Sequence, residues 1–102
     1  MIKTETECKE GYVYIMRIHD LCKIGISVNP VRRERQMNSH SPYKVEEGFV
    51  SCWFDDAKKY ESILHRKYIK NNDHGEWFKI NYENAVSFLT KLCDQYTKGE
   101  LK

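Results

Sequence analysis

Two short runs early in the chain alternate between apolar and polar positions and predict a β-hairpin. They cover residues 12–18 and 21–27, with only two residues between them, and such alternation is typical of half-buried strands. Pairing Ile18 with Leu21 puts the apolar residues of both runs on one face, whereas a slip of one residue would mix the two faces. The apolar pattern therefore selects this register. Its apolar face consists of Val13, Ile15, Cys22, Ile24 and Ile26.

The opposite face of the predicted hairpin carries polar and small residues that packing alone does not explain. In the selected register Tyr14 lies opposite Gly25, and Lys23 is its diagonal neighbour on the second strand. Long side chains at diagonal positions are within reach of each other. A phenol, an ammonium group and a glycine on one face indicate a site. The residues of this face are Tyr12, Tyr14, Lys23, Gly25 and Ser27.

An arginine-rich helix is expected directly after the hairpin. Asn29 and Pro30 form a helix-start signal, with asparagine as the cap and proline at the first helical position. We expect the helix to end near residue 38. Its arginines are spread around the helix axis, so only one or two can face the sheet. Arg33, one turn into the helix, is the best candidate. The three arginines are Arg32, Arg33 and Arg35.

The rest of the chain predicts one more strand, two helices and a short extended segment. Residues 49–54 are aromatic and β-forming, which predicts a third strand buried on both faces. We expect Asp55 to cap an amphipathic helix that ends near residue 71. Residues 76–80 form a short extended piece, and Asn81 begins a final amphipathic helix. The order β-β-α-β-α-(β)-α predicts an α+β fold with a small three-stranded antiparallel sheet flanked by helices.

Composition limits the class of protein. With 102 residues we expect a single domain over residues 11–97, preceded by a flexible N-terminal arm at residues 1–10. The formal net charge of +2 permits a nucleic-acid partner without requiring one. No segment suits a signal peptide or a membrane span, so we expect an intracellular, cytoplasmic protein without a membrane partner.

A glutamate in the apolar stripe of the second predicted helix is the main candidate for chemistry outside the hairpin. Glu61 lies between Ala57 and Leu64 at helical spacing, and buried carboxylates are rare unless they are paired or bind a metal ion. Pairing with a basic neighbour and metal binding are both open on this pattern. His65, one turn later, is either a hydrogen-bonding surface residue or part of the same site.

Together these residues resemble the motifs of the GIY-YIG nuclease superfamily. The resemblance covers residues 11–80 and is closest to a branch of small phage, viral and bacterial members with a Lys-Ile-Gly second motif. Each motif alone is common, but the ordered set is fairly specific. The matching motifs are Val13-Tyr14-Ile15, Lys23-Ile24-Gly25, Arg33, the helical pair Glu61 and His65, and Gly75-Glu76-Trp77-Phe78.

The resemblance implies a metal-dependent DNA endonuclease. It implies that Tyr14 activates or positions the attacking water, that Arg33 stabilises the phosphate, and that Glu61 binds one divalent cation, Mg²⁺ or Mn²⁺. Double-stranded DNA is the expected partner, and cutting both strands would require a dimer or two successive nicks. The candidate substrate-binding residues beside these are Gly25, Ser27, Arg35 and His65.

Two positions depart from the family pattern. Lys23 stands where the family has its second tyrosine, and Met37 stands where several members have histidine. A tyrosine with a pKa near 10 is a weak base at neutral pH. A nearby ammonium group favours the phenolate, and a neutral lysine can itself accept the phenolic proton. Lys23 is therefore expected to be catalytic together with Tyr14, and Glu76 is a candidate for the polar residue that many members carry late in the domain.

Two other functions fit the same sequence. The first is a catalytically weak module of nuclease fold that binds nucleic acid without cleaving it, through phosphate contacts that salt would weaken. The second is a protein-interaction domain that uses exposed aromatic residues. The basic residues available for phosphate contacts are Arg32, Arg35, Lys58, Lys59 and Arg66.

Overall fold

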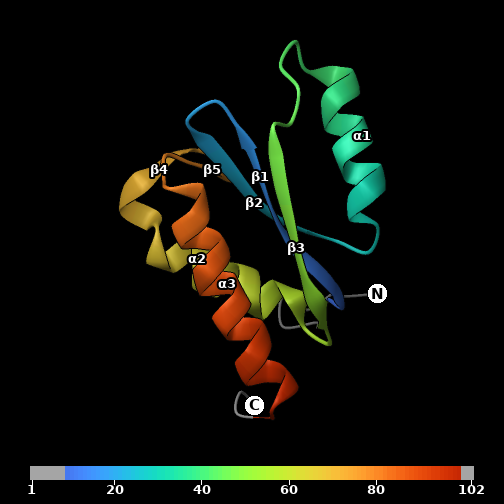
Figure 1. Cartoon of the computed structure of the whole chain (residues 1–102), viewed down its shortest axis with the longest axis vertical. Coiled ribbons are helices and arrows are strands. Elements are labelled where there is room, and N and C mark those ends of the chain that lie inside the picture. The colour runs from blue at the N-terminus through green and yellow to red at the C-terminus, as the bar shows by residue number, and fades with distance from the viewer. Residues whose placement is uncertain (1–8, 100–102) are drawn as a thin grey trace, which may run out of the picture.

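The computed structural model describes residues 9–99, which form one antiparallel sheet with helices on both faces (Figure 1). The strands are β1 (Gly11–Ile18), β2 (Leu21–Ser27), β3 (Glu47–Phe54), β4 (Asn72–His74) and β5 (Trp77–Phe78), in the spatial order β3-β1-β2-β5-β4. The helices are α1 (Pro30–His40), α2 (Ala57–Lys67) and α3 (Tyr82–Thr97), with a short 3-10 helix η1 (Ile69–Asn71) after α2. Residues 1–8 of the predicted arm lie outside the described residues.

The prediction of a three-stranded sheet is wrong, because the segment after α2 adds two strands. β5 pairs with β2 at Cys22 and Lys23, and β4 pairs with β5. These strands have three and two residues, which is too short for an alternating pattern to be visible in the sequence. Gly75 lies between them with a φ of +53°, a conformation that glycine adopts without strain. The α+β class is unchanged.

The hairpin of β1 and β2 has the register that the apolar pattern selected. Ile18 pairs with Leu21, and Tyr14 pairs with Gly25. His19 has a φ of +57° in the turn, as tight two-residue hairpin turns require. Tyr14, Gly25 and Lys23 therefore share the face opposite the core, and this face is the one on the side of α1 (Figure 1).

The prediction that the third strand is buried on both faces is also wrong. β3 is an edge strand of the sheet, and Val50 and Trp53 are 44% and 43% exposed. The aromatic composition of β3 does not show whether strands pair with it on one side or on both. The register with β1 shifts between Tyr12 and Tyr14, and the Ser51 hydroxyl accepts a hydrogen bond of 2.9 Å from the backbone N–H of Val13 there. This bond satisfies the buried N–H of Val13, which the irregular strand pairing would otherwise leave without an acceptor.

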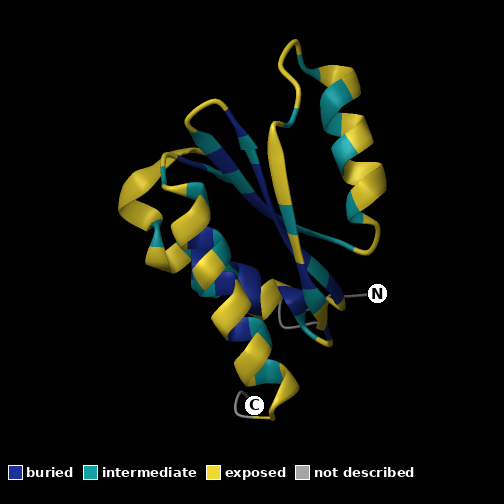
Figure 2. Cartoon of the chain, in the orientation of Figure 1, coloured by how far each residue is buried: buried dark blue, intermediate teal, exposed yellow. Residues whose placement is uncertain are grey.

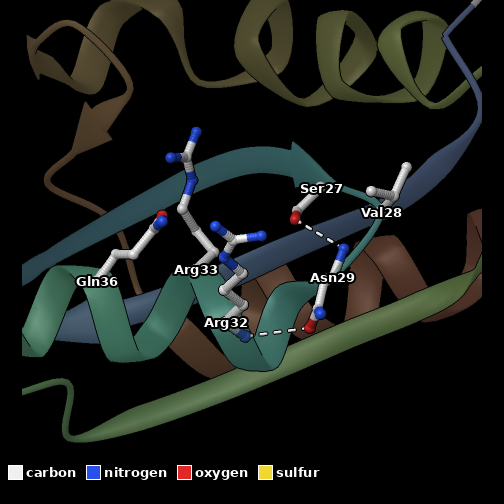
Figure 3. A pocket seen from close by; sticks show the side chains of 6 residues that line it. All are labelled: Ser27, Val28, Asn29, Arg32, Arg33 and Gln36. Carbon is white, nitrogen blue, oxygen red and sulfur yellow. Dashed lines mark hydrogen bonds between the residues drawn. The ribbon is translucent and has the colours of Figure 1, made fainter.

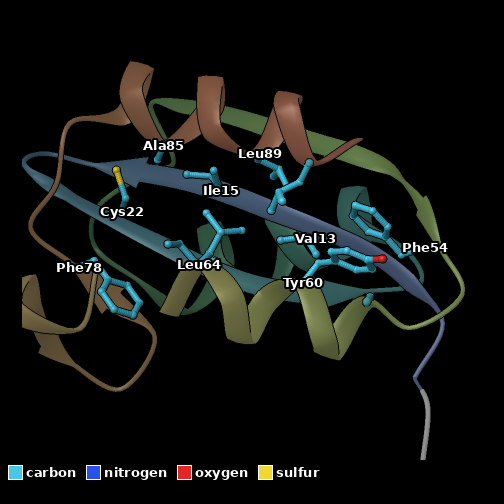
Figure 4. Packing of buried hydrophobic residues seen from close by; sticks show 12 residues of the cluster. Val13, Ile15, Cys22, Phe54, Tyr60, Leu64, Phe78, Ala85 and Leu89 are labelled. Carbon is cyan, nitrogen blue, oxygen red and sulfur yellow. The ribbon is translucent and has the colours of Figure 1, made fainter. Parts of the chain in front are cut away.

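The core lies between one face of the sheet and helices α2 and α3 (Figure 4). Figure 2 shows the buried residues concentrated in β1, β2 and the sheet-facing sides of these helices. The Phe54 and Tyr60 rings stack with their centroids 4.1 Å apart, which fixes the start of α2 against the end of β3. The central cluster comprises Val13, Ile15, Cys22, Ile24, Phe54, Ala57, Tyr60, Leu64, Phe78, Ala85, Leu89 and Leu92.

Side-chain caps set where each helix begins. Asn29 and Asn81 cap α1 and α3 as predicted, each accepting a hydrogen bond from a backbone N–H three residues later. The cap of α2 is Asp56 rather than the predicted Asp55. The α-helix ends at Lys67 with Tyr68 as its C-cap, and the last three residues of the predicted helix form η1. Within residues 9–99 no helix is long and apolar enough to cross a membrane.

Candidate active site

The Tyr14 ring lies across Gly25, its partner on β2. Tyr14 is fully buried, and a Cβ atom built on Gly25 would lie 2.5 Å from the Tyr14 hydroxyl oxygen and 2.6 Å from the ring carbon that bears it. Only glycine leaves room for the ring in this position. The hydroxyl is thereby carried across β2 towards the edge of that strand, beyond the short pairing with β5 at Cys22 and Lys23.

The Tyr14 hydroxyl is buried but has no hydrogen-bond partner among the described residues. Burial raises the pKa of this phenol above its ordinary value, and the carboxylates of Glu76 and Glu61 act in the same direction. The nearby Arg33 guanidinium lowers the pKa of Tyr14, although it makes no well-aligned hydrogen bond to the phenol oxygen. The phenol therefore lies within the electrostatic reach of one cation and two acids.

Arg33 belongs to a small pocket at the start of α1. The pocket has a volume of about 190 Å³ and is lined by Ser27, Val28, Asn29, Arg32, Arg33 and Gln36. Figure 3 shows Arg32 and Arg33 extending from the helix beside β2. Two guanidinium groups beside the first turn of a helix favour a bound anion. The Ser27 hydroxyl accepts a hydrogen bond of 2.9 Å from the Asn29 N–H, which holds the turn into the helix.

Arg35 and Arg33 are both exposed on α1, but only Arg33 is among the residues that line the pocket. The predicted role of Arg35 in binding substrate therefore stays a prediction.

Glu61 is a buried carboxylate on α2, with 1% of its surface exposed. Its Oε1 accepts a hydrogen bond of 2.9 Å from the Lys58 ammonium. Its Oε2 is buried without a hydrogen-bond partner among the described residues, and His65 Nε2 lies 4.0 Å from it. Burial is the main cause of a raised pKa at this carboxyl group, and Lys58 only partly opposes it. A buried oxygen without a partner is unfavourable, so a ligand for it is the natural expectation.

Glu76 and His65 complete a cluster with Glu61. One ligand atom from each of the three lies within 4.8 Å of the others. The backbone N–H of Ile24 donates to the Glu76 carbonyl at 3.0 Å, and His65 Nε2 lies 2.9 Å from the Ile24 carbonyl oxygen. Because a carbonyl only accepts, this nitrogen carries a proton and is not open to a metal ion. The two carboxylates are the groups that suit a hard cation such as Mg²⁺ or Mn²⁺.

Lys23 contacts Glu76 and Trp77. Its ammonium nitrogen lies 3.7 Å from Glu76 Oε1 and 5.7 Å from the centroid of the Trp77 ring. Arg33 is the cation that acts on the Tyr14 phenol. The predicted assistance of Tyr14 by Lys23 is not tested by this arrangement and stays a prediction.

A protein-family model matches residues 11–93 of the chain, and its description is T5orf172 domain. The match covers most of the chain. The chain belongs to the T5orf172 domain family. This is a phage-associated domain of nuclease-type fold. No curated protein and no solved structure was found to match the chain.

The T5orf172 match spans all five strands and the whole of the candidate site, from Tyr14 to Glu76. Sequence reasoning gave Glu76 only a minor place in the site, and it gave the neighbouring Trp77 no role in the site although it recognised the motif that contains both. The available signal was the turn Asp73-His74-Gly75 directly before them, which indicates a hairpin. A hairpin there brings both residues against β2, where Lys23 lies.

Proposed function

We propose that this T5orf172 domain is a divalent-cation-dependent DNA endonuclease that hydrolyses phosphodiester bonds in the way of GIY-YIG nucleases. The observation that supports this proposal is the gathering of unlike groups at one edge of β2. Tyr14 lies across Gly25 under the influence of Arg33, and the carboxylates of Glu61 and Glu76 lie within 4.8 Å of each other nearby. Phosphodiester hydrolysis requires a base, a cation and stabilisation of developing charge together.

Tyr14 is the proposed base. At neutral pH its buried phenol is mostly protonated, because burial raises its pKa, but the Arg33 guanidinium favours the phenolate. The phenolate takes a proton from the attacking water as the water oxygen bonds to phosphorus and the bond from phosphorus to the leaving oxygen breaks. Lys23 adds a positive charge beside Glu76 at the same edge, and we retain it as a partner of Tyr14.

Arg33 is the proposed phosphate ligand. Its guanidinium offers several N–H donors in a plane, which suits two phosphate oxygens at once. The pocket that it lines with Arg32 and Ser27 lies beside the Tyr14 and Gly25 pair. A phosphate in this pocket would bring a neighbouring scissile bond close to the phenol.

Glu61 and Glu76 are the proposed ligands of the divalent cation. Glu61 Oε2 is a buried oxygen without a hydrogen-bond partner among the described residues, and Glu76 supplies a second oxygen within 4.8 Å of the Glu61 carboxylate. When bound, Mg²⁺ or Mn²⁺ would polarise the phosphate and neutralise charge that develops on its oxygens. These cations need only one or two carboxylates, with water and substrate completing the shell.

The test is cleavage of supercoiled plasmid DNA with Mg²⁺ or Mn²⁺, which detects single nicks and double-strand cuts. Tyr14→Phe, Arg33→Ala and Glu61→Gln should each lose activity, and chelation of the cation should abolish cleavage by the parent. Lys91→Ala and Glu83→Gln change exposed residues of α3 and serve as controls that should cleave normally. If the three site variants cleave as well as the parent, the site is assigned wrongly.

A second candidate function is DNA binding without cleavage. The observation that favours it is the pairing of Glu61 with Lys58 at 2.9 Å, since this ion pair already neutralises part of the proposed cation site. In that case the arginines of α1 bind phosphate, and no cation restores cleavage. Salt-sensitive binding of plasmid by a parent protein that never cleaves it would favour this candidate.

A further inference from the structure

A second pocket, of about 370 Å³, lies at the hairpin-turn end of the sheet. It is formed by the turn between β1 and β2, the loop after α1, and the β4–β5 hairpin. We call it the aromatic pocket, because half of the residues that line it carry rings. The residues that matter for its function are His19, Leu21, Tyr43, His74 and Trp77.

The rings of the aromatic pocket form two contacting pairs. His19 and Tyr43 meet edge to face with centroids 4.8 Å apart, and His74 stacks on Trp77 at 6.4 Å. Tyr43 is 56% exposed although it is large and partly apolar. Exposed rings gathered around a hollow are typical of ligand-binding sites.

The aromatic pocket adjoins the candidate active site through Trp77. Lys23 pairs with Trp77 across β2 and β5, and its ammonium lies 5.7 Å from the centroid of that ring. Leu21, which lines the pocket, is two residues from Lys23 on the same face of β2, a distance of about 7 Å along the strand. The pocket lined by Arg32 and Arg33 lies at the other end of β2, at Ser27. The active site thus lies between a pocket for anions and a pocket for flat apolar groups.

We propose that the aromatic pocket binds an unpaired nucleobase of the DNA strand held at the active site. This inference rests on the proposed function for its choice of ligand. Every base has a face that stacks on aromatic side chains. The Nδ1 atoms of His19 and His74 face Glu46 and Asp73, and their Nε2 atoms offer hydrogen-bonding groups for a base edge. Asp20, an acid of the rim, lies 3.5 Å from Lys79, so its repulsion of a nearby phosphate is reduced.

The proposal defines a substrate class. A base inside a duplex is covered on both sides by its neighbours, so it enters a pocket only after leaving the stack. DNA with unpaired bases next to the scissile phosphate, such as an overhang, a flap or a melted segment, presents the base without this penalty. We therefore infer that the domain prefers such DNA to a continuous duplex.

Tryptophan fluorescence offers a direct test, because the chain contains two tryptophans. The variant Trp53→Phe leaves Trp77 as the sole tryptophan, and adding Glu61→Gln prevents cleavage during the titration. A single-stranded oligonucleotide should quench Trp77 and bind more tightly than the duplex of the same sequence. Adding Tyr43→Ala should weaken binding of the single strand by a factor of about 5 to 150, the range expected for one lost stacking contact, and leave duplex binding unchanged.

The outcomes separate the inference from the proposed function. Equal affinity for single strand and duplex, or an unchanged affinity after Tyr43→Ala, overturns the aromatic pocket as a base-binding site even if the parent cleaves DNA. Selective binding that depends on Tyr43, in a protein whose parent never cleaves DNA, keeps the pocket and rejects the endonuclease. Loss of binding to both DNA forms would show general phosphate binding at Tyr43 and would also overturn the inference. Trp53→Ala, which removes an exposed ring outside the pocket, is the matched control and should preserve the preference.

Discussion

The Tyr14 phenol occupies the space that a side chain at Gly25 would need. A Cβ atom at Gly25 would lie 2.5 Å from the phenol oxygen, although the two residues are simple partners in the β1–β2 register. Gly25 has no unusual backbone torsion in this strand. A glycine is needed there because the Tyr14 ring occupies the space of a side chain. The position of the proposed base is therefore set by the absence of a side chain.

Gly25→Ala should displace the Tyr14 ring and abolish most of the activity. An added methyl group in such a contact costs about 1–3 kcal/mol of stability, and misplacing a catalytic group by about 1 Å lowers the rate about 100-fold. Gly48→Ala is the matched control, because a Cβ there would have its nearest neighbour at 3.8 Å. Cleavage assays and thermal unfolding of both variants check the prediction. An active Gly25→Ala protein would contradict it.

Glu61→Gln should abolish cleavage without lowering the free energy of unfolding. The carboxylate is buried with a raised pKa, so at neutral pH its charge opposes folding, whereas an amide oxygen still accepts the bond from Lys58. We expect the free energy of unfolding to be unchanged or to rise by about 1 kcal/mol, while cleavage falls at least about 100-fold. Thermal unfolding and cleavage are measured on the same samples. A strongly lowered melting temperature would show that Glu61 is a structural ion pair instead.

Glu76→Gln should weaken binding of the divalent cation. Mg²⁺ or Mn²⁺ that binds only the folded state raises the melting temperature, and loss of one of two carboxylate ligands should lower the affinity about 10- to 100-fold. The shift in melting temperature with cation concentration, or calorimetric titration, measures this without any need for activity. Glu83→Gln should behave as the parent. An unchanged cation affinity in Glu76→Gln would leave Glu61 as the sole carboxylate ligand.

The parts of the fold that the sequence predicted correctly are those with long, regular patterns. The hairpin register followed from five apolar residues that only one pairing places on the same face, and the starts of α1 and α3 followed from Asn29 and Asn81. The two added strands were missed because β4 and β5 are too short to show a period. The edge position of β3 was missed because alternation describes the faces of a strand and not its neighbours.

The candidate site was predictable where one residue contradicted its local pattern. Glu61 was conspicuous as an acid within an apolar stripe, and Gly25 as a glycine inside a strand. The partners of Lys23 were not predictable, because Glu76 and Trp77 reach it only through the β4–β5 hairpin. Lys23 and Arg33 were both candidates to act on Tyr14. The choice between them depends on the β4–β5 hairpin and on the position of α1, and the local sequence determines neither.

Cleavage should become faster as pH rises through the neutral and alkaline range. Burial holds the pKa of Tyr14 above its ordinary value of 10.0, so the phenolate fraction grows about tenfold for each pH unit below that pKa. If Tyr14 is the base, kcat/KM follows this fraction and does not level off before the protein begins to unfold. A rate independent of pH between neutral and mildly alkaline conditions would show that the phenol only positions the water.

Substitutions of Arg33 should change the pH dependence of cleavage. Its guanidinium lowers the pKa that burial raises, so Arg33→Ala should move the pKa of Tyr14 further upward and reduce the phenolate fraction at every pH below it. Arg33→Lys retains the positive charge but not the planar donor group, and should recover the pH profile more fully than the affinity for DNA. Comparing kcat and KM across pH for the parent and both variants separates these two effects. Equal losses in kcat for the alanine and lysine variants would mean that Arg33 acts through its geometry on phosphate and not through its charge on Tyr14.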